Sequence, residues 1–394
     1  MIPVMSRALA LALLACVAWI APVVAADQQS PSAPAPTGIA VDGEGNVYAS
    51  DYALDRVVKF GPDGSVLAQW GGSGSAPGQF NAPFGVAVDA SGNVFVVDQL
   101  NSRVQRFLGD GTLVGGWGTA GASAGALRTP FGVAVGGGRI YVADFGNDRV
   151  DVFASDGTPL PPVGGRGTGD GQFQRPAGVA VGSDGALYVT DHFNDRVERF
   201  SVDGHFQAQL GVPTISATVP QLTVSTTGTP TPVGTSTATP TSTVIASSAA
   251  SATPTALAST SSSSVTSSGV APSGVASSAA AAASPSPVSA AAPLPDPQLR
   301  RPEGIALDRD GNLWVADYGH DRVVKLAPDG RALLSLGSSG SAPGEFVGPK
   351  GVAVDPTTGR LYVADTGNAR VQRLAPDGTP EASWALPPPP TPSS

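Results

Sequence analysis

The chain has three histidines, and two of them follow aspartates that recur at matching places in the sequence. His192 comes one residue after such an aspartate, His320 comes three residues after another, and Glu303 lies between them. Imidazole and carboxylate groups are common zinc ligands, so these side chains are the candidates for a metal site. Because the two histidines occupy non-equivalent positions, the alternative is that both are exposed loop residues. We therefore predict no catalytic residue and no cofactor, and leave a metal ion open with His192 and His320 as its candidate ligands.

Other side-chain chemistry is scarce. The string Gly121-Ala122-Ser123-Ala124-Gly125 matches a serine-hydrolase elbow, but that elbow needs a strand-to-helix turn, and this string falls in a glycine-rich connecting loop. The single cysteine, Cys16, excludes a disulfide framework and a cysteine-ligated metal site. With 31 acidic against 22 basic residues, the chain has a net charge of -9, which argues against nucleic acid as a partner.

An aspartate followed five residues later by an arginine recurs six times. The pairs are Asp51 with Arg56, Asp98 with Arg103, Asp144 with Arg149, Asp191 with Arg196, Asp317 with Arg322, and Asp365 with Arg370. Six equivalent pairs cannot all line one active site, and a planar guanidinium is suited to gripping a carboxylate. We predict that the pairs are structural and fasten a turn in each repeat. The alternative is a ring of charge at a binding face.

The elements that must position these residues are repeated. A segment Pro-x-Gly-(Val/Ile)-Ala-(Val/Leu) begins at Pro36, Pro83, Pro130, Pro176, Pro302 and Pro349, with spacings of 47, 47, 46, 126 and 47 residues. Each copy contains four short segments rich in β-branched or aromatic residues and separated by Gly, Asp, Asn or Ser, which predicts a four-stranded meander. One such sheet cannot bury both faces, whereas six around an axis can. The sequence predicts an all-β, six-bladed propeller; a linear solenoid would need capping repeats, and none of the copies resembles one.

Two positions vary between the repeats, and in a propeller both open on the same end of the central channel. They are the residue between Pro and Gly and the residue after the aspartate. From them we predict a binding face formed by aromatic and polar side chains: Tyr52, Phe84, Gln99, Phe131, Phe145, His192, Glu303, Tyr318 and Lys350. The alternative is that several of these aromatic residues cap the channel as part of the core.

The repeats resemble a known family. The stretches Tyr141–Val150, Trp314–Val323 and Tyr362–Val371, each following a Pro-x-Gly segment, are similar to the NHL repeat. The resemblance implies a six-bladed NHL-type β-propeller. Such propellers serve as ligand-binding modules, as sensor ectodomains and more rarely as lyases or lactonases, so the fold does not imply one activity. We predict a ligand- or protein-binding or scaffolding module; the alternative is an extracytoplasmic lyase or lactonase that uses His192, His320 and Glu303.

The first 26 residues have the pattern of a signal peptide. Arg7 precedes an apolar run over 8–21, and small residues follow at 23–26. We expect a secreted or extracytoplasmic protein with no membrane span after cleavage. A retained signal anchor and a lipoprotein carrying its lipid on Cys16 are the alternatives.

The remaining segments divide the propeller. Residues 212–297 are rich in Ser, Thr, Ala and Pro, and are predicted to be a disordered, low-complexity linker between blades 1–4 (36–211) and blades 5–6 (298–386). Residues 387–394 form a proline-rich tail. We expect a monomer whose ligand is a protein, a peptide or a glycan. A structural repeat protein of the cell envelope is a further interpretation.

Overall fold

The computed structural model describes residues 33–211 and 298–388. The predicted signal peptide, the predicted linker over 212–297 and most of the proline-rich tail lie outside the described residues. No helix in the described ranges is both long enough and apolar enough to cross a membrane.

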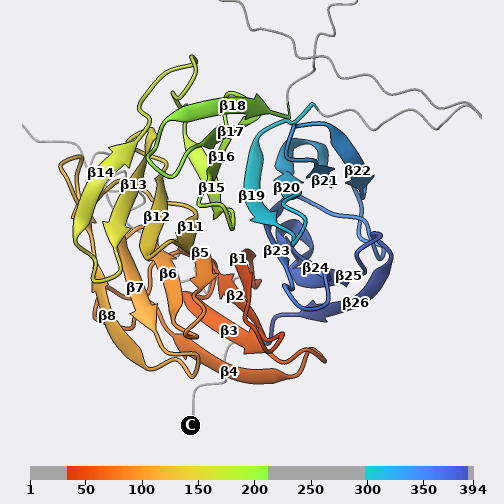
Figure 1. Cartoon of the computed structure of the whole chain (residues 1–394). Coiled ribbons are helices and arrows are strands. Elements are labelled where there is room, and N and C mark those ends of the chain that lie inside the picture. Colours follow the sequence, from red (N-terminus) through yellow and green to blue (C-terminus); the bar gives the residue numbers. More distant parts are fainter. Residues whose placement is uncertain (1–32, 212–297, 389–394) are drawn as a thin grey trace, which may run out of the picture. The chain divides into compact units, whose positions relative to one another are not determined.

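Six four-stranded antiparallel sheets are arranged around a central channel (Figure 1). Blades 1 and 2 contain β1 (Pro36–Val41), β2 (Val47–Asp51), β3 (Arg56–Phe60), β4 (Val66–Gly71), β5 (Pro83–Val88), β6 (Val94–Asp98), β7 (Arg103–Phe107) and β8 (Leu113–Trp117). Blades 3 and 4 contain β11 (Val133–Gly136), β12 (Arg139–Asp144), β13 (Arg149–Ala154), β14 (Pro159–Val163), β15 (Pro176–Val181), β16 (Leu187–Asp191), β17 (Arg196–Phe200) and β18 (Phe206–Leu210). Blades 5 and 6 contain β19 (Pro302–Leu307), β20 (Leu313–Asp317), β21 (Arg322–Leu326), β22 (Ala332–Leu336), β23 (Pro349–Val354), β24 (Leu361–Asp365), β25 (Arg370–Leu374) and β26 (Pro380–Ala385). The predicted all-β, six-bladed propeller is confirmed.

Four short elements lie outside the blade strands. A parallel pair, β9 (Thr119–Ala120) and β10 (Ala126–Leu127), lies between blades 2 and 3. The loop that joins these two strands contains Ser123, so the Gly121–Gly125 string is not a strand-to-helix turn. Single 3-10 turns, η1 (Tyr318–His320) and η2 (Thr366–Asn368), follow β20 and β24.

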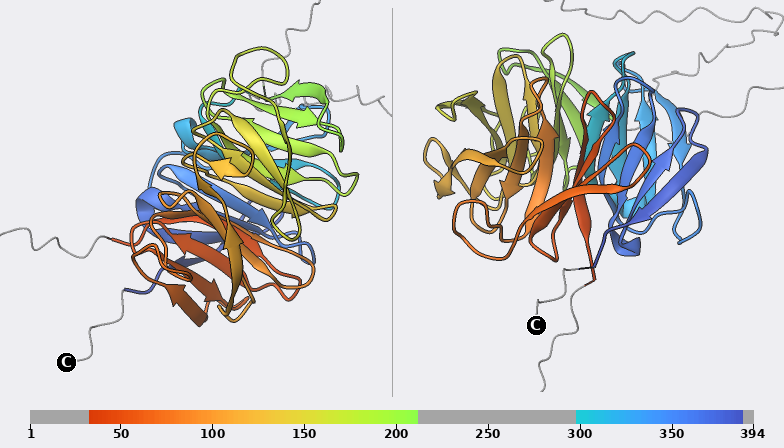
Figure 2. Two further views of the ribbon diagram at one scale, coloured as in Figure 1. Left: turned by 90° about the vertical axis from the view of Figure 1, so that its left-hand side faces the viewer. Right: turned by 90° about the horizontal axis from the view of Figure 1, so that it is seen from below.

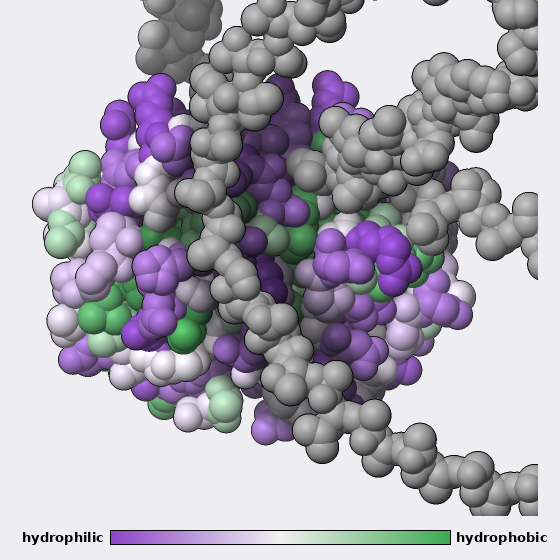
Figure 3. All heavy atoms as spheres, turned by 45° about the horizontal axis from the view of Figure 1, so that its top comes forward, coloured by the Kyte–Doolittle hydropathy of each residue, from purple (hydrophilic) through white to green (hydrophobic). Residues whose placement is uncertain are grey.

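Within each blade the strands pair in chain order, so the first strand lines the channel and the fourth lies outermost. The second strand is sandwiched between neighbouring blades, and β2, β6, β16, β20 and β24 are buried along their whole length. The outer strands expose apolar side chains such as Val66 and Leu67 on β4 and Val114 on β8. Figure 3 shows small hydrophobic areas scattered among hydrophilic ones on one side of the molecule.

The core is distributed between the blades. Six clusters of buried apolar side chains are present among the described residues, and each combines side chains from two adjacent blades. The cluster that joins blade 6 to blade 1 contains Tyr362 and Leu386 from one and Val47 and Phe60 from the other. Each blade is built from consecutive strands, so no sheet joins the two ends of the chain. The ring is therefore closed by this packing contact and not by strand pairing. Figure 2 shows the first and last blades side by side.

The glycine of each Pro-x-Gly segment is required by the close approach of the innermost strands. A Cβ on Gly304 would meet the carbonyl oxygen of Lys350 in the next blade, and a Cβ on Gly351 would meet that of Thr37. The same relation holds for Gly38, Gly85, Gly132 and Gly178. The repeated glycine therefore lets the innermost strands of all six blades pack closely around a narrow channel.

Candidate functional site

The two variable positions of each repeat lie at the same end of the channel. In blade 2, Pro83 pairs with Asp98 across β5 and β6, which brings Phe84 and Gln99 to the same edge of the sheet. The equivalent pairs of proline and aspartate occur in blades 1, 4, 5 and 6. The loops before the first strand and after the second strand thus open together, and we call this end of the propeller the channel mouth.

Aromatic side chains follow one another around the channel mouth. Ring centroids are 6.4 Å apart between Tyr52 and Phe84, 4.3 Å between Phe84 and Phe131, and 4.0 Å between Phe131 and Phe145, whose rings stack. His192 continues the series, with centroids 6.0 Å from Phe145 and 6.5 Å from Tyr318. We call these six residues, Tyr52, Phe84, Phe131, Phe145, His192 and Tyr318, the aromatic arc.

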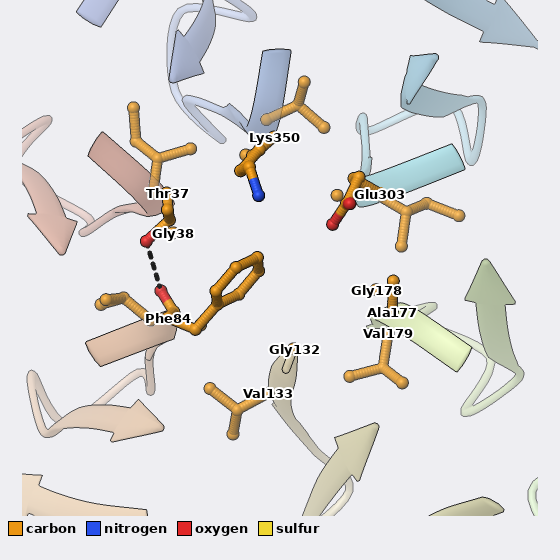
Figure 4. A pocket seen from close by; sticks show the side chains of 17 residues that line it. Thr37, Gly38, Phe84, Gly132, Val133, Ala177, Gly178, Val179, Glu303 and Lys350 are labelled. Carbon is orange, nitrogen blue, oxygen red and sulfur yellow. Dashed lines mark hydrogen bonds between the residues drawn. The ribbon is translucent and has the colours of Figure 1, made fainter. Parts of the chain in front are cut away.

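Lys350 links Tyr318, at one end of this arc, to Phe84, the second residue from the other end. Its Nζ lies 5.1 Å from the ring centroid of Phe84 and 5.6 Å from that of Tyr318. Figure 4 shows Lys350, Glu303 and Phe84 pointing towards the channel axis. An ammonium group over aromatic faces is stabilised by the ring quadrupoles, so the arc and Lys350 form one connected surface.

The predicted binding residues differ in how much solvent they meet. Tyr52 is 38% exposed, whereas Phe84 and Gln99 are buried, with 7% and 4% of their surface exposed. Phe131, Phe145, Tyr318 and Lys350 are half-buried. Part of the predicted set is therefore buried, and the rest remains accessible at the mouth.

His192 and Glu303 form a buried polar pair within this surface. The Nδ1 atom of His192 lies 3.6 Å from Oε1 of Glu303, and neither that nitrogen nor Glu303 Oε2 has a hydrogen-bond partner among the described residues. Burial lowers the pKa of His192 to about 4. Burial raises the pKa of Glu303 to about 7, against the opposing effect of Lys350. At neutral pH the imidazole is thus uncharged and the carboxyl is partly protonated, so the two groups are not an ion pair.

His320 has a different environment. Its Nδ1 lies 2.9 Å from Oδ2 of Asp317, at the position where four other blades carry an asparagine that donates to the equivalent aspartate. In blade 5, His320 therefore replaces that asparagine as the side chain that contacts the aspartate. No group of three or more His, Cys, Asp or Glu side chains in the described ranges is arranged to hold a metal ion.

Five of the six Asp–Arg pairs are brought together by the structure. The Nε–Oδ2 distances are 3.1 Å for Asp51 and Arg56, 2.7 Å for Asp98 and Arg103, 3.0 Å for Asp191 and Arg196, 2.7 Å for Asp317 and Arg322, and 2.7 Å for Asp365 and Arg370. In blade 3, Arg149 instead donates through Nε to Asp151 at 2.9 Å, and its Nη2 lies 3.9 Å from Asp144.

The arginines make a second set of contacts that the sequence reasoning missed. Arg103 donates to the carbonyl oxygens of Ser75, Ala76 and Gln79, in the loop that enters its blade from the preceding one. Arg149, Arg196 and Arg370 bind the corresponding loops in the same way. The strings over 74–80 and 340–346 are nearly identical, and this repetition of a loop could have indicated a shared contact.

Fold and channel mouth together define a six-bladed propeller with a ring of variable side chains at one end. The NHL repeat model matches residues 173–200, 299–326 and 346–374, which lie in blades 4, 5 and 6. These matches and the six-bladed architecture agree, and the chain is an NHL-repeat protein.

Similarity to characterised proteins is local or distant. Rattus norvegicus peptidylglycine alpha-amidating monooxygenase is 44% identical over 63 residues, which is 15% of this chain and 6% of that enzyme. The chain thus matches only a small part of that relative's length. Among solved structures, a streptogramin B lyase has 13% identity and a TM-score of 0.49, covering 91% of this chain and 85% of its own. A Bacteroides thetaiotaomicron protein of unknown function has 15% identity and a TM-score of 0.51, covering 86% and 69%. At 15% identity, the Bacteroides thetaiotaomicron structure shows the fold alone.

Proposed function

We propose that this protein is a binding or scaffolding module that takes a ligand or protein partner at the channel mouth. The observation that carries the proposal is the continuous aromatic arc closed by Lys350. Half-buried aromatic side chains are the anchors that binding surfaces use most, because they offer a large contact area at little cost in conformational entropy.

The repeat itself supports this choice of surface. The glycine, aspartate and arginine positions keep the same residue type in all six copies, as a framework requires. At the mouth, the residue after Pro is Thr37, Phe84, Phe131, Ala177, Glu303 or Lys350 in successive blades. Because the fold accepts such different side chains there, their identities are free to serve recognition.

A capture experiment with the full chain tests the proposal. The wild type, Phe131→Ala at the mouth and Leu108→Ala at the opposite end of the propeller are immobilised and exposed to culture fluid and envelope extract. We expect a specific protein, peptide or glycan to be retained by the wild type and by Leu108→Ala, and lost with Phe131→Ala. Equal retention by all three proteins would place recognition elsewhere on the molecule.

Export belongs to the same proposal. The apolar run over 8–21 and the small residues that follow it support cleavage of a signal peptide, and binding would then take place outside the cytoplasm. Sequencing the N-terminus of the protein recovered from its natural host should show Ala26 or Asp27. An uncleaved N-terminus would support a signal anchor instead, and a lipidated Cys16 would support a lipoprotein.

A lyase or lactonase is the second candidate, and the His192–Glu303 pair is what favours it. A neutral imidazole and a carboxyl with a pKa of about 7 lie 3.6 Å apart, and a proton acceptor beside a proton donor is what acid–base catalysis needs. Metal analysis of the purified protein by mass spectrometry distinguishes the two functions. Stoichiometric zinc or calcium that is lost in His192→Ala would favour the enzyme.

A further inference from the structure

A second feature opens at the channel mouth, between the loops of blades 5 and 6. It is a cavity of about 410 Å³ lined by Arg300, Arg301, Tyr318, Gly319, Asp321, Val347, Gly348, Lys350, Thr366 and Gly367. Tyr318 and Lys350 also belong to the surface described above, so the cavity continues directly from the aromatic arc. Its volume falls within the usual range for sites that hold small molecules.

Positive charge dominates this cavity. Arg300, Arg301 and Lys350 contribute three cations, and none of them forms an ion pair with a carboxylate of the described residues. Asp321 is the single acidic residue in the lining, and its Oδ1 accepts the backbone N–H of Gly348 at 2.7 Å. An excess of cations is unusual in a chain whose net charge is -9.

The other blades show that the fold does not require these arginines. The two residues before the repeat proline are Asn81-Ala82, Arg128-Thr129, Gln174-Arg175 and Val347-Gly348 in blades 2, 3, 4 and 6, and only blade 5 has two arginines. The position of Lys350 likewise holds Thr, Phe, Ala or Glu elsewhere. The three cations therefore converge on one cavity at positions where the other blades fold with other side chains.

Flat apolar surface lies beside the charge. The guanidinium carbon of Arg301 is 6.0 Å from the ring centroid of Phe193, and Lys350 lies over Tyr318 and Phe84. A guanidinium fork matches the geometry of a carboxylate, and aromatic side chains favour a planar partner. A dianion is less suitable than a monoanion, because Asp321 adds a negative charge to the lining.

We propose that this cavity binds an aromatic carboxylic acid, with its carboxylate held by Arg301, Arg300 and Lys350 and its ring against Tyr318. This assignment rests on the proposed binding function and specifies the chemical class of ligand for one part of the mouth. The aromatic arc beyond Tyr318 then accommodates the rest of a larger ligand.

Three probes that share one ring system and differ in charge test the assignment. Binding of indole-3-acetate, indole-3-acetamide and tryptamine to the full chain is measured by isothermal titration calorimetry at low ionic strength. Because hydrogen bonds to charged groups are stronger than neutral ones, the carboxylate should bind about tenfold more tightly than the amide, and the ammonium probe most weakly. Raising the salt concentration should narrow the difference in affinity between indole-3-acetate and indole-3-acetamide.

Matched variants locate the site. Arg301→Gln and Lys350→Met should each lower the affinity for indole-3-acetate by about tenfold. The affinity for indole-3-acetamide should stay nearly unchanged. Arg309→Gln removes one positive charge from the same blade at the opposite end of the propeller, and should leave both affinities as in the wild type. Thermal unfolding of each variant checks that the propeller remains folded.

The outcomes separate this assignment from the proposed function. Equal binding of acetate and amide, tighter binding of tryptamine, absence of binding by indole-3-acetate, or an unchanged affinity in folded Arg301→Gln and Lys350→Met would overturn the carboxylate site. Those results would leave the capture experiment with Phe131→Ala unaffected. If Phe131→Ala and Leu108→Ala retained the captured ligand equally, that result would instead count against recognition anywhere at the channel mouth.

Discussion

One position in the third strand shows how a single residue sets the electrostatics of a blade. In blades 2 and 6 it is a glutamine: Gln105 and Gln372 donate through Nε2 to the buried aspartate of their blade, at 3.3 Å and 2.9 Å. Blade 4 has Glu198 instead, which accepts the backbone N–H of Gly171 through Oε1 and has a buried Oε2 without a partner. Burial raises the pKa of Glu198 to about 7, against the opposing effect of Arg196, whose Nη2 lies 3.0 Å from Glu198 Oε1. Near neutral pH Glu198 is therefore partly protonated, and the protonated acid can donate as glutamine does.

This difference makes the stability of blade 4 depend on pH. The pKa of Glu198 rises from 4.5 to about 7 on folding, so its ionisation lowers stability as the pH increases through that interval. We expect Glu198→Gln to be more stable than the wild type by about 1–3 kcal/mol at pH 8 and nearly equal to it at pH 4.5. Thermal unfolding of both proteins at the two pH values measures the difference. Gln372→Glu is the reverse exchange in blade 6 and should introduce the same pH dependence; a gain in Glu198→Gln that is equal at both pH values would contradict this account.

Arg149 tests the structural role of the repeated arginines. It donates to Asp151 and to carbonyl oxygens of the loop at 122–126, and its Nη2 lies 3.9 Å from Asp144. Burial and Asp151 raise the pKa of Asp144 to about 7, so Asp144 needs a nearby cation once it ionises. Arg149→Ala should lower stability by about 2–4 kcal/mol at pH 8 and by less at pH 5, where protonation neutralises Asp144. Melting curves of Arg149→Ala and of Arg309→Ala, an exposed arginine without an ion pair, provide the comparison; an unchanged curve together with lost ligand binding would assign Arg149 to the binding face.

At the scale of the elements, the innermost strands depend on one backbone contact. Gly304 lies against the carbonyl oxygen of Lys350, and a methyl group there would force β19 and β23 apart. Gly43, in the turn after β1, has no neighbour within 4 Å of an added Cβ. Gly304→Ala should therefore cost about 1–3 kcal/mol, whereas Gly43→Ala should be nearly neutral. Chemical denaturation of the two variants distinguishes them, and similar midpoints would mean that the inner strands can relax without cost.

The strands were predictable because their signals are local. The Pro-x-Gly segment, the turn residues and the alternation of β-branched side chains recur with a period of 46–47 residues, and each acts within one blade. The aspartate and arginine of a pair are also neighbours across one turn, so their approach followed from register. The contacts of Arg103 with Ser75, Ala76 and Gln79 were not predicted, because they join two blades.

At the scale of the whole molecule, the contact that closes the ring is of a kind that also joins other neighbouring blades: a tryptophan of one blade packs on a phenylalanine of the next. Trp70 packs on Phe107 of the next blade and Trp117 packs on Phe153, with centroids 5.9 and 6.0 Å apart. Trp384 stacks on Phe60 at 5.8 Å, but here the next blade is the first one, at the other end of the chain. Arg56 strengthens this seam by donating to the carbonyl oxygens of Pro387 and Pro388.

The seam should be the weakest point of the ring. Trp384→Ala and Trp117→Ala remove the same half-buried side chain, and each should cost about 2–4 kcal/mol. Because no covalent connection holds blades 1 and 6 together, Trp384→Ala should also speed amide exchange in β1–β4 and β23–β26 selectively. Hydrogen exchange followed by mass spectrometry measures this. If Trp117→Ala loosens the terminal blades as much as Trp384→Ala does, the ring unfolds as one unit and the seam is not special.

The sequence by itself determined the number of blades, the strands within them and the end of the channel where variable side chains gather. These features follow from local propensity, turn chemistry and a repeating period, all of which operate within about 47 residues. Only the tertiary structure decided that Phe84 is buried while Tyr52 is exposed, that His192 meets Glu303, and that Arg300 and Arg301 share a cavity with Lys350. These contacts depend on how closely neighbouring blades approach and on which side chains fill the space between them, and a period in the sequence does not specify either.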